Sequence, residues 1–180
     1  MRLLKENAIG VVVDIQERLF PHIDGHEQLE KNTKTLVEGL KALGVPFLVT
    51  EQYKKGLGDT VAGIEALVQD DPHMEKMAFS CCDEPKFMEA LETSTKRTVI
   101  LAGMETHICL LQTAIDLKER GFTPVVVEDC VSSRTKDNKR IALERMRQEG
   151  IIVTSYESIL FELCRVAGSD AFKTISKLVK

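Results

Sequence analysis

Apolar runs and amphipathic stretches alternate along this chain from end to end. Short apolar runs predict strands, and longer stretches with an apolar residue every three or four positions predict helices. The expected strands are 9–14, 47–50, 98–102, 124–128 and 151–154. The expected helices are 29–43, 60–68, 84–93, 108–120, 137–148, 156–166 and 170–178. Glycine follows several of these helices at the position where helices commonly end.

This alternation predicts an α/β fold, a three-layer α-β-α sandwich around a largely parallel sheet of five or six strands. The run 9–14 is almost wholly apolar, as expected of a parallel strand that is covered on both faces. No repeat or linker divides the 180 residues, so we expect a single domain over residues 1–180. The least regular stretches, 51–59 and 70–83, should lie near the carboxyl edge of the sheet, where α/β proteins place ligands.

Composition and charge narrow the range of partners. The net charge is −4, and the one basic cluster, which includes Arg134, is small and is expected to form a solvated helix face. We therefore expect no nucleic-acid and no membrane partner. Five cysteines without the spacing of a disulfide framework, and a short, charged N-terminal segment unlike a signal peptide, predict a cytoplasmic protein. No phosphate-binding glycine motif follows a strand, so no nucleotide cofactor is expected.

The segment 103–109, Gly-Met-Glu-Thr-His-Ile-Cys, joins a predicted strand to a predicted helix. With Thr106 as N-cap, Cys109 is the third residue of the helix, where its N–H is free and the helix dipole favours negative charge. That place would lower the pKa of the thiol and offer its amide to an oxyanion. The alternative is a small buried hydrophobic residue, the commoner role of cysteine.

Two polar residues can join Cys109 if the topology allows. Asp14 ends the first predicted strand, so it converges with Cys109 if their strands are neighbours. Lys76 lies among apolar residues that indicate partial burial, and beside the other two it would stabilise a thiolate and hold the carboxylate. Position alone is equally consistent with Asp14 as a helix N-cap or as an acceptor that stabilises a loop. For Lys76 the default interpretation is an ordinary surface lysine.

Taken in order, these residues resemble the isochorismatase-like cysteine hydrolase superfamily, and the resemblance covers nearly the whole chain. The matching motifs are Asp14 followed by Gln16, Lys76 before Phe79-Ser80, and Gly103-x-x-Thr106-x-x-Cys109. The resemblance implies the Rossmann-like hydrolase fold of that superfamily and an Asp14–Lys76–Cys109 catalytic triad. It also implies a non-proline cis peptide at Met104–Glu105, which turns the Glu105 N–H toward the same point as the Cys109 N–H.

The reaction implied by the resemblance is nucleophilic acyl transfer. Asp14, helped by Lys76, takes the thiol proton, and the Cys109 thiolate attacks a carbonyl carbon. The N–H groups of Glu105 and Cys109 form the oxyanion hole. The expected enzyme is a hydrolase that cleaves an amide-type C–N bond of a small-molecule substrate through a thioester intermediate. Because relatives assemble as dimers up to octamers, a homo-oligomer is expected.

The chain departs from the nicotinamidases of this superfamily at their metal site. Those enzymes carry an Asp-x-His pair after the second strand, where this chain has Gln52 and Lys54, which are poor metal ligands. We therefore predict that the protein binds no metal and no other cofactor. We expect it to belong to a metal-free branch of the superfamily that is distinct from the nicotinamidases. We expect Gln52, Tyr53 and Phe20 to bind the substrate, the alternatives being an ordered surface loop and a helix-packing phenylalanine. True isochorismatases lack the cysteine, so Cys109 favours amide substrates.

Two other functions remain open. A catalytically inactive family member would act as an interaction or scaffold protein, although such a protein has no need of an intact triad. A thiol redox protein would use Cys81, Cys82 or Cys109. Adjacent cysteines rarely form a relaxed disulfide, however, and no Cys-x-x-Cys pair is present.

Overall fold

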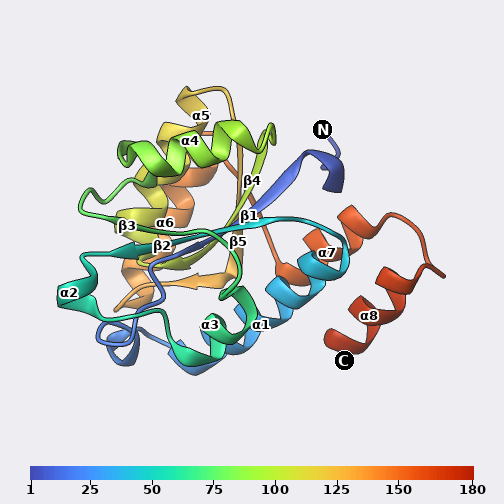
Figure 1. Cartoon of the computed structure of the whole chain (residues 1–180), viewed down its shortest axis with the longest axis horizontal. Helices are drawn as coiled ribbons and strands as arrows, with labels where there is room; N and C mark the ends of the chain where they lie inside the picture. The colour runs from blue at the N-terminus through green and yellow to red at the C-terminus, as the bar shows by residue number, and fades with distance from the viewer.

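A six-stranded parallel sheet forms the centre of the molecule, with helices on both faces (Figure 1). The structure is a computed structural model and describes residues 1–180. The strand order is β3-β2-β1-β4-β5-β6, which confirms the predicted α/β sandwich. The strands are β1 (Ala8–Val13), β2 (Phe47–Gln52), β3 (His73–Lys76), β4 (Thr98–Met104), β5 (Thr123–Ser132) and β6 (Ile152–Thr154).

The helices divide between the two faces of the sheet. One face is covered by α1 (His26–Ala42), α3 (Ala62–Val68), α7 (Tyr156–Cys164) and α8 (Asp170–Leu178). The other is covered by α4 (Pro85–Thr93), α5 (Leu111–Glu119) and α6 (Lys136–Gln148). A short helix, α2 (Lys54–Leu57), follows β2, and a π-helical turn, Thr106–Leu110, precedes α5. None of the helices combines the length and apolar character needed to cross a bilayer.

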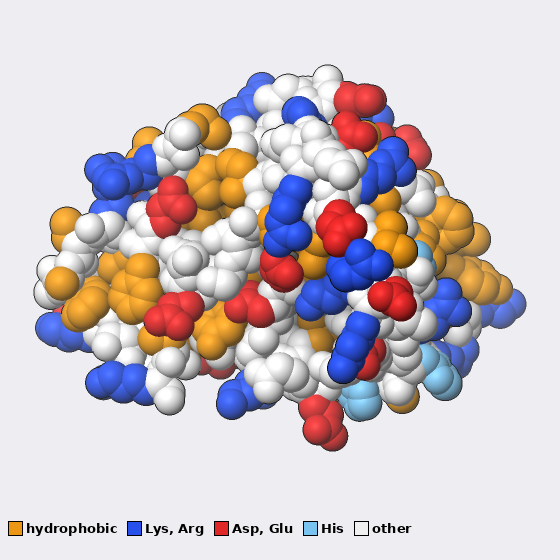
Figure 2. All heavy atoms as spheres, turned by 180° about the vertical axis from the view of Figure 1, so that it is seen from behind, with side chains coloured by type: hydrophobic (Ala, Val, Ile, Leu, Met, Phe, Trp, Pro, Cys, Tyr) orange, Lys and Arg blue, Asp and Glu red, His pale blue; other side chains and the backbone are white.

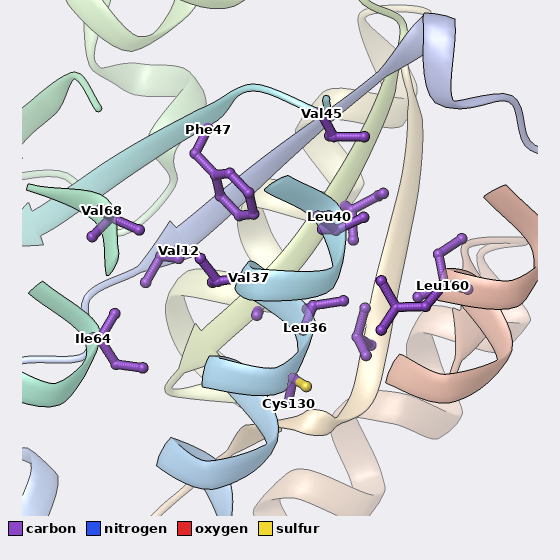
Figure 3. Packing of buried hydrophobic residues seen from close by; sticks show 14 of the residues in the cluster. Val12, Leu36, Val37, Leu40, Val45, Phe47, Ile64, Val68, Cys130 and Leu160 are labelled. Carbon is purple, nitrogen blue, oxygen red and sulfur yellow. The ribbon is translucent and has the colours of Figure 1, made fainter. Parts of the chain in front are cut away.

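Each face of the sheet has its own apolar core, of 26 and 24 buried residues. Successive residues of β1 alternate between them, so Val12 packs under α1 while Val11 and Val13 pack on the opposite side. Figure 3 shows Val12 close to the apolar residues of α1 and to Phe47 of β2. Burial on both sides explains why this strand reads as a continuous apolar run rather than an alternating one.

Several helix starts follow from local capping. The hydroxyls of Thr135, Ser155 and Ser169 accept hydrogen bonds from backbone N–H groups in the first turns of α6, α7 and α8. A hydroxyl at this place satisfies an amide that has no partner within the helix. The three helices therefore begin within one residue of the predicted starts.

The stretches expected to be irregular are more ordered than predicted. The first contains the end of β2 and the helix α2, and the second contains β3. Strand β3 has only four residues, of which Met74 and Lys76 are buried, so it offers no apolar run to recognise. Its pairing sets Gln52 beside Lys76 at the carboxyl edge of the sheet.

A glycine allows β4 to approach β1 closely. Gly103 pairs with Val13 and has a φ of +138°. A Cβ atom at this position would lie 2.0 Å from the Val13 carbonyl oxygen, so only glycine fits. The close approach carries the chain after β4 toward Asp14, which follows β1. In the view of Figure 2, acidic and basic side chains are mixed over the surface without a dominant patch of one sign.

Candidate active site

Asp14 lies at the centre of the candidate site, directly after β1. The residue is 1% exposed and its φ is +53°, a left-handed conformation that aspartate adopts more readily than most residues. The Thr50 hydroxyl donates to Asp14 Oδ1 at 2.8 Å, and Lys76 Nζ donates to Oδ2 at 2.7 Å. Both carboxylate oxygens are thus satisfied by donors from the neighbouring strands β2 and β3.

Lys76 is fully buried and shares its charge among several acceptors. Besides Asp14, its ammonium donates to Gln52 Oε1 at 2.6 Å and to the Phe79 carbonyl at 3.0 Å. Burial is the largest single influence on the pKa of Lys76 and would lower it, but Asp14, Cys81 and Cys109 together outweigh that cost and the pKa is raised. Lys76 therefore stays positively charged and pairs with the Asp14 carboxylate.

Cys109 lies in the π-helical turn rather than in a regular first helical turn. The Glu105 carbonyl accepts hydrogen bonds from the N–H groups of Ile108 and Leu110. The predicted N-cap role of Thr106 is wrong, because its hydroxyl is buried without a hydrogen-bond partner and Glu105 occupies the cap position. The wider turn is a local rearrangement that apolar periodicity does not reveal.

The predicted lowering of the Cys109 pKa is also wrong. The thiol is 7% exposed, and burial together with the nearby Asp14 carboxylate raises its pKa, while Lys76 offsets only part of that effect. Cys109 is therefore a neutral thiol that lies near the Asp14 carboxylate, a group that can take its proton.

Glu105 connects this turn to the loop after β5. The peptide bond between Met104 and Glu105 is cis, as predicted. The buried Glu105 carboxylate accepts from the Arg134 backbone N–H at 2.9 Å and from Arg134 Nε at 3.1 Å. Arg134 is exposed as expected, at 54% of its side chain, but it precedes α6 rather than lying on a helix face, and it binds Glu105. Sequence spacing gives no sign of this contact, since the two residues are 29 positions apart.

These groups surround one small pocket with a volume of about 100 Å³. Its lining consists of Asp14, Leu19, Gln52, Leu57, Phe79, Met104, Glu105, Ile108 and Cys109. Of the three residues expected to bind substrate, Gln52 lines it, whereas Phe20 packs against His26 with ring centroids 5.0 Å apart and Tyr53 lies outside on the surface. Leu19 and Leu57 form the walls instead. Their positions depend on loop geometry that the sequence pattern does not reveal.

Comparison with known proteins identifies the family. Residues 8–158 match the family model of the Isochorismatase domain. This chain belongs to the isochorismatase family. Family membership supports a hydrolase, and it confirms the resemblance inferred from the motifs around Asp14, Lys76 and Cys109.

The relatives of this isochorismatase-family protein align over almost its full length. It is 40% identical to the secreted isochorismatase effector Isc1 of Phytophthora sojae, with 99% of this chain and 87% of that protein covered. It is 37% identical to mouse isochorismatase domain-containing protein 2A, with 99% and 85% covered. A solved structure described as MAR1 ribonuclease from Caenorhabditis elegans superposes with a TM-score of 0.94 at 34% identity. The superposition covers 99% of this chain and 92% of that one. The P. sojae name describes a secreted protein, and a cytoplasmic location for the present chain stays a prediction.

Gln16 fixes the backbone around the pocket of this family member. Its buried amide donates from Nε2 to the carbonyls of Gln52 at 3.1 Å and Gly58 at 2.8 Å. Its Oε1 accepts from the Gln52 N–H at 2.7 Å. The loop after β1 is thereby joined to both ends of the segment that contains α2. Only the family resemblance singled out this glutamine in the sequence.

The residues expected to replace metal ligands have other partners. Gln52 Oε1 is bound to Lys76, and Lys54 pairs with Glu51 at 2.8 Å and with Asp59 at 2.7 Å. No group of three or more His, Cys, Asp and Glu side chains is arranged to hold a metal ion. A metal-free, cofactor-free site remains a prediction.

Two further thiols lie near the triad. Cys81 and Cys82 are buried and free, and Cys81 Sγ is 3.8 Å from the Thr50 hydroxyl. Burial raises the pKa of Cys81 to about 11 and that of Cys82 to about 12. Protonated, enclosed thiols react slowly with oxidants, which does not favour the redox alternative.

Proposed function

We propose that this protein is a cysteine hydrolase that cleaves the amide-type C–N bond of a small uncharged molecule through a thioester. Asp14, Lys76 and Cys109 are the proposed catalytic residues. The observation that carries this proposal is a neutral, buried Cys109 thiol sharing one small pocket with the Asp14 carboxylate, to which Lys76 Nζ donates a hydrogen bond. This arrangement of nucleophile, base and orienting cation matches nucleophilic acyl transfer.

In the first half of the reaction, Asp14 takes the Cys109 proton as Sγ forms a bond to the substrate carbonyl carbon. The carbonyl oxygen becomes an oxyanion, which accepts hydrogen bonds from the N–H groups of Glu105 and Cys109. The oxyanion then collapses, and the C–N bond breaks. Asp14 passes its proton to the departing nitrogen, which leaves as ammonia or an amine.

In the second half, Asp14 accepts a proton from a water molecule as the water oxygen attacks the thioester carbon. The same N–H groups hold the second oxyanion. The C–S bond breaks with its electron pair on sulfur, the proton returns to Cys109, and the carboxylic acid leaves. Lys76 remains an ammonium throughout, because it offsets the negative charge that moves between Asp14 and the substrate.

The pocket favours a small acyl group without charge. Its walls are mostly apolar, and no lysine, arginine or histidine lines it. The two carboxylates in the lining, Asp14 and Glu105, are already paired with Lys76 and Arg134. An anionic substrate would lose its hydration there without gaining a cation, and such desolvation is costly. We therefore propose short, neutral primary amides as the substrate class.

We also propose that the protein forms a homo-oligomer. The structure of YcaC from Escherichia coli is described as an octameric hydrolase of unknown specificity, and it superposes with a TM-score of 0.93 at 25% identity, covering 99% of this chain and 89% of that one. Beside the pocket, Met77 is 66% exposed and Phe79 is 54% exposed, which suits an interface better than free solvent. Light scattering on the purified protein tests this, and a monomer at micromolar concentration would contradict it.

The catalytic proposal is tested by ammonia release from a series of neutral amides, from acetamide to isobutyramide, with the anionic succinamate for comparison. We expect activity on the neutral series, none on succinamate, and loss of activity in Cys109→Ala. Cys164→Ala is the matched control, since Cys164 lies on α7 outside the pocket. Rapid quenching and peptide mass spectrometry should find the acyl group on Cys109. A folded wild-type protein that neither releases ammonia nor carries an acyl group on Cys109 would refute the proposal.

A further inference from the structure

We infer that Arg134 is a positioning residue for catalysis, which holds the Glu105 carboxylate and thereby aims the Glu105 N–H at the oxyanion. This inference rests on the proposed function, in which that N–H is one of two oxyanion donors. Arg134 itself does not line the pocket. Its effect on the reaction passes through Glu105.

The contact between the two residues fixes Glu105 at several points. The backbone N–H of Arg134 donates to Oε2, and Nε lies 3.1 Å from both carboxylate oxygens. The Glu105 side chain is almost fully buried, so without Arg134 a carboxylate would remain there with too few partners. The next ionisable side chain is that of His107, whose Nδ1 lies 3.9 Å from Glu105 Oε2. Arg134 is therefore the main determinant of where the Glu105 carboxylate lies.

The loop that carries Arg134 is itself anchored. The Ser132 hydroxyl donates to the Asp24 carbonyl at 2.7 Å, and the Asp24 N–H donates to the Ser133 carbonyl at 3.0 Å. The Ser133 hydroxyl is 3.0 Å from His107 Nδ1. These bonds join the loop after β5 to the loop before α1 and to the turn that contains Cys109. The backbone N–H of Arg134 thus meets Glu105 from a fixed direction.

A surface ion pair without a catalytic role would behave differently. Exposed ion pairs contribute little to stability, and their loss affects all reactions of a nearby thiol alike. Oxyanion donors, in contrast, must point at the position of the developing charge, and small displacements reduce the rate strongly. A positioning role therefore predicts a selective loss, confined to reactions that pass through an oxyanion.

Two reactions of the same thiol separate these roles. p-Nitrophenyl acetate acylates Cys109: the sulfur bonds to the acetyl carbon, the ester C–O bond breaks with its electrons on p-nitrophenolate, and Asp14 takes the thiol proton. This path includes a tetrahedral oxyanion. Iodoacetamide alkylates Cys109 by displacing iodide at a saturated carbon, so no oxyanion forms. Both rates are followed at Cys109 by peptide mass spectrometry, with p-nitrophenolate release as a second measure of acylation.

In Arg134→Met we expect acylation of Cys109 to slow by about tenfold or more, since loss of one oxyanion donor typically costs 10²–10³. Alkylation should stay within about twofold of the wild-type rate. Both variants keep the backbone N–H at position 134, but only Arg134→Lys keeps the side-chain charge, and it should recover part of the acylation rate. The matched control is Arg140→Met on α6, whose side chain pairs with Asp137 and Glu144 at the surface. It should leave both rates unchanged.

Folding of each variant is checked by circular dichroism, and Arg134→Lys serves if Arg134→Met does not fold. Unchanged acylation in the folded variants would overturn the inference. An equal fall in acylation and alkylation would overturn it too, because that result indicates a structural role. If wild-type Cys109 reacts with iodoacetamide but is not acylated at all, the proposed function fails and the inference fails with it. If wild-type Cys109 is acylated and Arg134→Met is acylated at the same rate, only the role of Arg134 is refuted and the proposed function stands.

Discussion

Replacing Thr50 by valine isolates the hydrogen bond that holds Asp14 from β2. Thr50 is buried, and its hydroxyl donates to Asp14 Oδ1 at 2.8 Å. Valine keeps the branched shape that suits a strand and removes only the donor. One oxygen of a buried carboxylate then loses its partner, while Lys76 still binds the other oxygen.

The expected cost follows from the charge on the acceptor. A hydrogen bond to a charged group contributes about 1.5–3 kcal/mol. Valine at position 50 should therefore lower the free energy of unfolding by that amount. For a domain of this length each kcal/mol corresponds to roughly 2–4 °C in the melting temperature, so we expect a fall of about 3–12 °C. Asp14 also loses an orienting contact, so hydrolysis should slow even where the variant remains folded.

Urea unfolding followed by circular dichroism measures the difference in unfolding free energy. The control is Thr33→Val, because the Thr33 hydroxyl is equally buried but has no hydrogen-bond partner. That change should be neutral or stabilising, since it removes an unsatisfied polar group. If Thr50→Val costs no more than Thr33→Val, the hydrogen bond does not hold Asp14 and our reasoning about the site is wrong.

Three further predictions follow from the site and the sheet. Because the pKa of Cys109 is raised above its ordinary value of 9.0, its alkylation by iodoacetamide should still be accelerating above pH 9; a plateau at lower pH in peptide mass spectrometry would contradict this. Lys76→Met leaves a buried carboxylate without its cation and should cost about 3–5 kcal/mol in urea unfolding at pH 8. The folded-state pKa of Lys76 is raised above 10.5, so the stabilisation by its pair with Asp14 is complete below pH 10.5 and is lost as the pH rises through the folded-state pKa. The difference in unfolding free energy between wild type and Lys76→Met should therefore shrink, and not grow, as the pH rises through that range. Gly103→Ala should abolish folding, judged by circular dichroism and soluble yield, because its Cβ would lie 2.0 Å from the Val13 carbonyl oxygen; a native-like spectrum would show that the strands can separate.

Much of the fold is predictable because burial leaves a direct mark on the sequence. Strand β1 is covered on both faces and is therefore apolar throughout, and α6, α7 and α8 begin where side-chain hydroxyls can cap them. Strand β3 leaves no such mark. It is an edge strand of four residues, and one of its two buried positions is Lys76, whose burial depends on the partners that the fold supplies.

The sequence singles out the residues of the candidate site but not their electrostatics. Asp14 and Cys109 converge because β1 and β4 are neighbours, a condition that the sequence left open and the sheet fulfils. The pKa of the thiol depends on how far water is excluded and on the distance to Asp14, and neither is written in local sequence. The contact of Arg134 with Glu105 is missed for a related reason. It joins loops that only the folded sheet brings together.

The hydrogen bonds of Gln16 have a consequence for how substrate preference can change. All of them end on backbone atoms, of Gln52 and Gly58, so they do not depend on which side chains the loops carry. Leu19 lies on the loop after β1 and Leu57 ends α2, so they belong to the two segments that Gln16 joins, and both line the pocket. Substitutions at these two positions can enlarge or narrow the pocket while the loop backbone keeps its path. The scaffold thus separates the proposed catalytic residues from those that set the size of the pocket.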